Sequence, residues 1–221
     1  MPFPLLLGHR GAGVSGSVPE NTFASFDLAL EHGCDGFEFD VRLTGDGRAL
    51  VCHDPKVGGI TVARAQPHQL PHLPWLEDVL LRYGQRIFLD IEIKVKDLET
   101  TVLAALREHT PQRGYVVSSL IPDVVMELKA RTAVVPVGII CDKPSQLARG
   151  RKLPVEYVMA HESLVDHRLV QEIQATGGRV FVWTVNDRKS MLRLASWGVD
   201  GIISDDTQLL ARTLQRPTTG D

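Results

Sequence analysis

Short apolar stretches recur along the chain, separated by longer segments of mixed polarity. Each stretch has the length of a strand and contains valine, isoleucine, leucine or phenylalanine, which favours extended structure between turns. We therefore predict eight strands, at residues 4–8, 36–41, 87–93, 115–119, 135–140, 156–160, 179–185 and 201–204.

The segments that follow these stretches fit amphipathic helices. In "NTFASFDLALEHG", Phe23, Phe26 and Leu30 recur at helical spacing, and Asn21 or Thr22 can cap the start of the helix. Similar patterns predict further helices at residues 75–83, 98–109, 122–131, 144–150, 166–176, 187–197 and 206–214.

Eight strands, each followed by a helix, are typical of a TIM (β/α)8 barrel. A doubly wound open sheet is the competing arrangement, but eight evenly spaced units in 221 residues favour a closed barrel. We expect one domain over residues 1–221. Residues 42–74 form an insertion after the second strand: "TGDG" is a hairpin turn signal, "RALVCHD" returns as a strand, and a loop rich in glycine and proline follows.

The composition narrows the classes of function. With 43% hydrophobic and 23% charged residues, the chain is ordinary for a soluble globular protein. A net charge of −3 and a pI ≈ 6.2 argue against a nucleic-acid partner, which usually requires a basic patch. No segment approaches the roughly 18 apolar residues of a membrane span, and the opening "MPFPLLLGHRG" lacks the basic region of a signal peptide.

The cysteines indicate a compartment. Cys34, Cys52 and Cys141 are odd in number and lack the spacing of a metal site. We interpret them as reduced thiols, which are typical of a cytoplasmic protein.

Acidic side chains share one face of two predicted strands. Because side chains alternate across a strand, Glu38 and Asp40 lie opposite their phenylalanine and valine neighbours. Asp90 and Glu92 repeat this arrangement on the third strand, and Lys94 follows them. These residues lie near the carboxyl ends of their strands, where barrel active sites are built. Converging carboxylates repel one another unless a cation lies among them, and oxygen-only ligation favours Mg²⁺ or Ca²⁺ over zinc.

Two histidines and two cations accompany these acids. His9 ends the first strand and His53 ends the hairpin strand, so they offer a general acid and a general base. A lone histidine is usually structural, but the neighbouring acids favour catalysis at both positions. Arg10 and Lys94 add positive charge, which favours an anionic ligand, and a phosphate fits best.

The stretch "GHRGAGVSGSVPENTFASFDLALEHGCDGFEFDVRLTGDGRALVCHDP" resembles the N-terminal signature of the glycerophosphodiester phosphodiesterase family. The order HRG, ENT, E-x-D, T-x-D-G and His-Asp carries the resemblance, and each piece alone would be weak evidence. The likeness continues in "LPWLEDVL", "DIEIK", "VWTVN" and "GVDGIISD", so it covers almost the whole chain.

This resemblance implies a metal-dependent TIM barrel that hydrolyses glycerophosphodiesters to glycerol 3-phosphate and an alcohol. The metal ligands that it implies are Glu38, Asp40 and Glu92, and its catalytic pair is His9 and His53. The substrate-binding residues that it implies are Arg10 and Lys94, which hold the phosphate, and Trp183, which shapes the pocket. The implied cofactor is one divalent cation, Mg²⁺ or Ca²⁺.

The chain departs from the family pattern in places. Residues 56–74 look like an abbreviated version of a longer insertion, and Asp90 stands where asparagine is common, which places a fourth carboxylate near the metal. Three alternatives stay open: a lysophospholipase D or sphingomyelinase D-like activity in the same barrel lineage, a phosphoinositide-type phospholipase C, and a non-catalytic phosphate-binding barrel. The phospholipase C barrels lack this order of motifs, and retention of both histidines and all three acids argues against a non-catalytic role.

Overall fold

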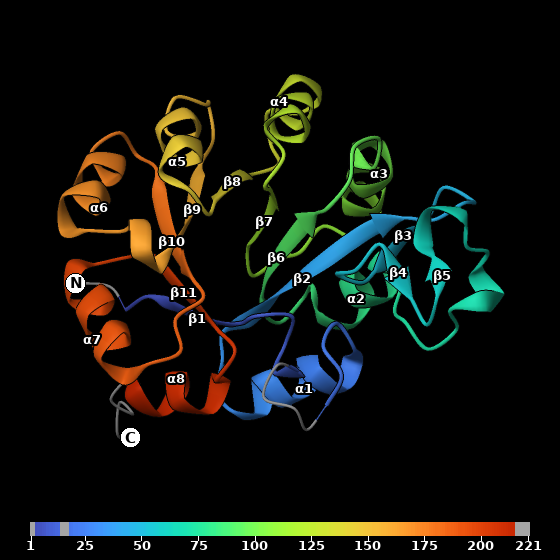
Figure 1. The fold of residues 1–221 in the computed structure, drawn as a ribbon, viewed down its shortest axis with the longest axis horizontal. Coiled ribbons are helices and arrows are strands. Elements are labelled where there is room, and N and C mark those ends of the chain that lie inside the picture. Colours follow the sequence, from blue (N-terminus) through green and yellow to red (C-terminus); the bar gives the residue numbers. More distant parts are fainter. Residues whose placement is uncertain (1–2, 14–17, 215–221) are drawn as a thin grey trace.

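Eight parallel strands close into a barrel in the computed structural model, which describes residues 3–13 and 18–214 (Figure 1). The sheet order is β1-β11-β10-β9-β8-β7-β6-β2, and β1 also pairs with β2, which closes the ring. The strands of the barrel are β1 (Leu5–Gly8), β2 (Gly36–Leu43), β6 (Phe88–Ile93), β7 (Tyr115–Ser119), β8 (Val137–Cys141), β9 (Tyr157–His161), β10 (Arg179–Trp183) and β11 (Gly201–Ser204). The predicted TIM barrel is confirmed.

Helices surround the barrel (Figure 1). They are α1 (Phe23–Glu31), α2 (Leu76–Tyr83), α3 (Glu99–Glu108), α4 (Pro122–Arg131), α5 (Pro144–Gly150), α6 (His167–Gln174), α7 (Arg188–Trp197) and α8 (Thr207–Thr213). Thr22 caps α1, because its hydroxyl accepts a hydrogen bond from the backbone of Ser25 at 3.2 Å. Within the described ranges, no helix is long and apolar enough to cross a membrane.

The main core lies between the barrel and the helices. Phe37 and Phe39 of β2 point outward and are fully buried there. The rings of Phe37 and Phe26 of α1 stack with centroids 4.1 Å apart, and Tyr83 of α2 meets Phe37 edge-on. Burying each of these side chains contributes about 1.5–3 kcal/mol. This packing fixes β2 with its even-numbered residues facing the barrel axis.

The interior of the barrel is apolar below its polar end. Its buried side chains are Leu7, Phe88, Val116, Ile140, Tyr157, Met159, Phe181 and Ile203. Gly201 leaves room for one of them, because a Cβ at this position would lie 2.8 Å from the ring of Phe181. The interior of the barrel is therefore filled with packed side chains, which support the strand ends above them.

The insertion after β2 has a small core of its own. Strand β3 (Ala49–Val51) pairs antiparallel with β2, as the hairpin signal predicts. Leu50, Cys52, Val62, Ala65 and Leu70 pack together beneath the remainder of the insertion.

The segment that we predict as loop also contains a short hairpin, β4 (Lys56–Val57) and β5 (Ile60–Thr61). Gly58 and Gly59 form its turn with φ of 57° and 84°, conformations that glycine adopts without strain. Short 3-10 turns follow at Val62–Arg64 and Pro67–Gln69. Strands of two residues are too short to leave an alternating pattern, so the sequence predicts only a loop here.

Candidate active site

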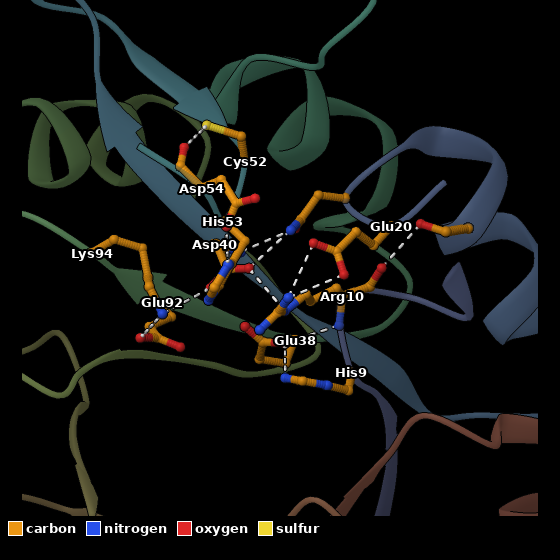
Figure 2. A network of polar contacts seen from close by, with 12 residues as sticks. His9, Arg10, Glu20, Glu38, Asp40, Cys52, His53, Asp54, Glu92 and Lys94 are labelled. Carbon is orange, nitrogen blue, oxygen red and sulfur yellow. Dashed lines mark hydrogen bonds and ion pairs between the residues drawn. The ribbon is translucent and has the colours of Figure 1, made fainter. Parts of the chain in front are cut away.

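A cavity of ≈ 110 Å³ opens at the carboxyl ends of the barrel strands. Seven of the eight predicted site residues line it: His9, Arg10, Glu38, His53, Glu92, Lys94 and Trp183. Asp40, the eighth, lies among them with 1% of its surface exposed (Figure 2). Asp90 and the apolar side chains of Leu120, Ile140, Met159 and Ile203 complete the wall. The cavity is thus acidic and polar on one side and apolar on the other.

Three buried carboxylates form the acidic side. Glu38 and Asp40 lie on β2 and Glu92 on β6, where Asp40 and Glu92 are register partners. One oxygen from each side chain lies within 4.8 Å of the others. Glu38 Oε1 and Asp40 Oδ1 accept no hydrogen bond from the described residues, although both atoms are buried.

Burial and mutual repulsion raise the pKa values of two of these carboxylates. Burial, then the charges of Asp40 and Glu92, raise the pKa of Glu38 well above its ordinary value. Burial and the charge of Asp40 likewise raise the pKa of Glu92, although Lys94 partly opposes them. Buried carboxylate oxygens that repel one another and lack hydrogen bonds are stabilised by a cation. The donor set is all oxygen, and therefore fits a hard divalent ion.

Two basic side chains lie beside the carboxylates. Lys94 Nζ donates to Glu92 Oε1 at 2.7 Å and lies 3.4 Å from Asp40 Oδ1. Arg10 Nε lies 3.3 Å from Asp40 Oδ2, and its Nη1 donates to both carboxylate oxygens of Glu20 at 3.0 Å. Burial lowers the pKa of Arg10 and of Lys94, but the surrounding acids outweigh it and raise both pKa values. Both groups therefore stay charged.

His9 is held by a carboxylate on the side of its ring that faces away from the acidic cluster. Its Nδ1 lies 2.7 Å from Asp205 Oδ1, while its Nε2 lies 3.9 Å from Glu38 Oε2. Asn186 Nδ2 donates to the other oxygen of Asp205 at 2.7 Å. Burial raises the pKa of Asp205, but the hydrogen bonds from His9 and Asn186 lower it overall. The ionised Asp205 keeps the proton of a neutral His9 on Nδ1, which leaves Nε2 free to accept a proton.

His53 has a similar but more exposed arrangement. Its Nδ1 lies 2.8 Å from Asp54 Oδ1, and Arg42 Nε donates to its backbone oxygen at 2.6 Å. The hydrogen bond with His53 lowers the pKa of Asp54. The Asp54 side chain is 71% exposed, so this part of the site faces solvent.

Some functional partners do not emerge from the sequence. Asn21 is not the helix cap that we considered: its φ is 56°, and its amide Nδ2 donates to Asp40 Oδ2 at 2.8 Å. Its Oδ1 accepts from the backbone N–H of Asp40 at 3.1 Å, so both ends of the amide orient this carboxylate. Asn21 belongs to the ENT motif, which is the signal that could have identified it.

The comparisons with known proteins decide the family. The model of the glycerophosphoryl diester phosphodiesterase family matches residues 9–99 and 89–209. The chain belongs to this family. The predicted family, and with it the phosphodiesterase class of enzyme, is thereby confirmed.

Individual relatives are similar to this chain over nearly its full length. A glycerophosphodiester phosphodiesterase from Caldanaerobacter subterraneus subsp. tengcongensis is 28% identical, over 96% of this chain and 98% of that protein. A phosphodiesterase from Oleispira antarctica, solved with the product sn-glycerol-3-phosphate, is 26% identical, with a TM-score of 0.84 over 97% of this chain and 98% of that one. A glycerophosphodiester phosphodiesterase from Thermotoga maritima, at 24% identity, has a TM-score of 0.82 over 96% and 99% of the two chains and supports the fold.

Proposed function

We propose that this phosphodiesterase hydrolyses glycerophosphodiesters to glycerol 3-phosphate and an alcohol, with one divalent cation, Mg²⁺ or Ca²⁺, as its cofactor. The observation that carries the proposal is the cluster of three buried carboxylates, in which Glu38 Oε1 and Asp40 Oδ1 accept no hydrogen bond from the described residues, flanked by two carboxylate-anchored histidines. The sn-glycerol-3-phosphate bound by the Oleispira antarctica relative supports the product.

Glu38, Asp40 and Glu92 would hold the cation. When bound, it supplies positive charge to a non-bridging phosphate oxygen and makes a nearby hydroxyl more acidic. Arg10 and Lys94 hold the remaining phosphate oxygens, because their charges already face the carboxylate cluster from two sides. They stabilise the negative charge that develops on these oxygens in the transition state.

The two histidines move the protons. Either a water oxygen attacks phosphorus directly, or the glycerol 2-hydroxyl attacks first and water then opens the cyclic phosphate; in both routes the bond from phosphorus to the alcohol oxygen breaks. One histidine takes the proton of the attacking hydroxyl on Nε2, and the other gives a proton to the departing alkoxide. Asp205 and Asp54 hold the Nδ1 atoms of the two rings, which directs both Nε2 atoms to this task.

The two ends of the substrate meet different surroundings. The glycerol carbons lie against the apolar wall that includes Trp183 and Met159. Trp183 is fixed there, because its indole N–H donates to the backbone oxygen of Met159 at 3.1 Å. The alcohol leaves on the side of His53 and Asp54, where the protein is open to solvent.

The cysteines support a cytoplasmic location. Cys34, Cys52 and Cys141 are all buried and free. Burial raises the pKa of Cys34 and Cys52 to about 12, so neither thiol is an activated nucleophile. Reduced thiols of this kind suit a reducing compartment, and we assign the enzyme to the glycerol and lipid metabolism of the cytoplasm.

Product analysis tests the proposed reaction. The purified enzyme, incubated with glycerophosphocholine and Mg²⁺ or Ca²⁺, should release glycerol 3-phosphate and choline. Release of phosphocholine and glycerol would contradict the assigned bond cleavage. Faster cleavage of lysophosphatidylcholine than of glycerophosphocholine would instead favour the lysophospholipase D alternative.

A further inference from the structure

Asp90 is a buried acid in the cavity wall to which the proposed reaction gives no task. It lies on β6, faces the barrel axis and is 1% exposed. Ser118 Oγ of β7 donates to its Oδ1 at 2.7 Å. Its Oδ2 is buried and has no hydrogen-bond partner among the described residues. A buried polar oxygen without a hydrogen-bond partner destabilises the fold by about 1–3 kcal/mol, so a ligand that bonds to this atom would remove that cost.

Asp90 does not belong to the group of oxygens that can share one cation. That group comprises Glu38, Asp40 and Glu92, whose oxygens lie within 4.8 Å of one another. Asp90 precedes Glu92 by two residues on the same strand and is the register partner of Glu38. Two residues along a strand span about 6.6 Å, so Asp90 lies one side-chain layer deeper in the barrel than Glu92.

Asp90 shares its cavity with the two basic side chains and with the apolar wall. A phosphate bound by Arg10 and Lys94 would place the adjoining carbon chain in this cavity, where Ile140 and Met159 offer apolar contacts. Asp90 lines the same cavity and offers a hydrogen-bonding oxygen to a hydroxyl of that chain. An apolar wall with one buried hydrogen-bonding group is the usual design of a selective small-molecule pocket.

We propose that Asp90 Oδ2 hydrogen-bonds the terminal hydroxyl of the glycerol moiety, and that Asp90, held by Ser118, makes the enzyme selective for glycerol over shorter or deoxygenated esters. This inference rests on the proposed function, because it places the glycerol end of the substrate in the cavity. A hydroxyl both donates and accepts, so the contact forms with either protonation state of the acid.

A pair of substrates tests the contact. One is glycerophosphocholine, and the other is the phosphocholine ester of propane-1,2-diol, which lacks only the terminal hydroxyl and keeps the hydroxyl next to the ester carbon. A pocket built to bond a hydroxyl discriminates against the analogue without it. The wild-type enzyme should show a kcat/KM about 10- to 100-fold higher for glycerophosphocholine.

Variants assign this selectivity to Asp90. In Asp90→Ala the ratio of the two kcat/KM values should fall to within about threefold of unity, since only the glycerol substrate loses a contact. Asp90→Asn keeps a hydrogen-bonding atom in the same place and should retain most of the selectivity. Ser118→Ala frees the carboxylate from its anchor and should lower the ratio partly. The matched control is Ser119→Ala on the same strand: its hydroxyl donates to the backbone oxygen of Ile93 rather than to Asp90, and the ratio should stay at its wild-type value.

Binding of the product gives a measurement without turnover. By calorimetry, glycerol 3-phosphate should bind the wild-type enzyme about 10- to 100-fold more tightly than propane-1,2-diol 1-phosphate, and Asp90→Ala should remove that difference. Equal kcat/KM values for the two diesters in the wild-type enzyme would overturn the role of Asp90 while leaving the proposed function intact. An unchanged ratio of the two kcat/KM values in Asp90→Ala would also overturn the role of Asp90 and leave the proposed function intact. The ligand of Oδ2 would then be a water molecule. A wild-type enzyme that cleaves neither diester would overturn the proposed function as well.

Discussion

The contact between His9 and Asp205 gives the sharpest test of the proton-transfer geometry, through the substitution Asp205→Asn. In the native site both carboxylate oxygens face donors: Oδ1 faces the ring Nδ1 and Oδ2 faces the amide of Asn186. The orientation of Asn186 is fixed, because its Oδ1 accepts from Ser204 Oγ at 3.0 Å and from the backbone N–H of residue 205 at 2.9 Å.

An amide at position 205 cannot satisfy both neighbours. If its NH₂ group faces Asn186, two donors oppose each other. If it faces His9, Nδ1 must accept, and the ring proton then moves to Nε2, where it blocks the task proposed for that atom. Hydrogen bonds to charged groups contribute about 1.5–3 kcal/mol, which at about 1.4 kcal/mol per decade corresponds to a loss of about 10- to 150-fold in kcat.

The assay measures kcat and KM with glycerophosphocholine, with glycerol 3-phosphate detected as it forms. We expect kcat to fall and KM to change less than about twofold, because Asp205 orients His9 rather than binding substrate. The control is Asp206→Asn, which removes the same charge one residue away. Asp206 caps α8 through the backbone N–H of Leu209 at 2.9 Å, and asparagine caps a helix equally well. Wild-type kcat in a folded Asp205→Asn protein would refute the reasoning.

Three further outcomes are expected. His9→Ala and His53→Ala should each lower kcat by about 10² to 10⁴ while the protein stays folded; a kcat near that of the wild type in either would make that histidine structural. The choline, ethanolamine and inositol diesters of glycerol 3-phosphate should differ in kcat/KM by less than about tenfold, because the described residues of the 56–74 segment do not line the cavity and the nearby Asp54 side chain is 71% exposed; a thousandfold preference would show that the headgroup is enclosed. Mg²⁺ or Ca²⁺ at a hundred times its Kd should stabilise the fold by about 2.7 kcal/mol and raise Tm by about 5–10 °C; an unchanged Tm would contradict a bound ion.

The barrel could be predicted because each strand and helix leaves its pattern in a short stretch of sequence. Hydrophobic periodicity and turn residues place α4 at residues 122–131 and α5 at residues 144–150, and the structure has the same bounds. Deviations occur where an end depends on a distant partner. Strand β2 continues to Leu43 rather than ending at Val41, because β3 pairs back along it.

The site could be predicted in part for the same reason. Glu38, Asp40 and Glu92 alternate with apolar neighbours on strands, so their common face is visible in the sequence. The partner of His9 is not, because Asp205 lies 196 positions away and reaches it only when β11 closes onto β1. The sequence offers both Asn21 and Thr22 as the helix cap, and the hydrogen bonds of Asn21 to Asp40 are not visible in it, because asparagine is a common cap as well as a donor to buried carboxylates.

The central claim is that the carboxylate cluster of Glu38, Asp40 and Glu92 works with a divalent cation, and the turnover of metal-stripped enzyme tests it most directly. The protein is treated with a chelator and dialysed, its metal content is measured, and glycerophosphocholine hydrolysis is followed before and after addition of Mg²⁺ or Ca²⁺. We predict a loss of at least about a hundredfold, since the ion supplies several kcal/mol of charge stabilisation, and full recovery on addition of the right ion. Undiminished turnover by protein shown to be free of metal would contradict the account.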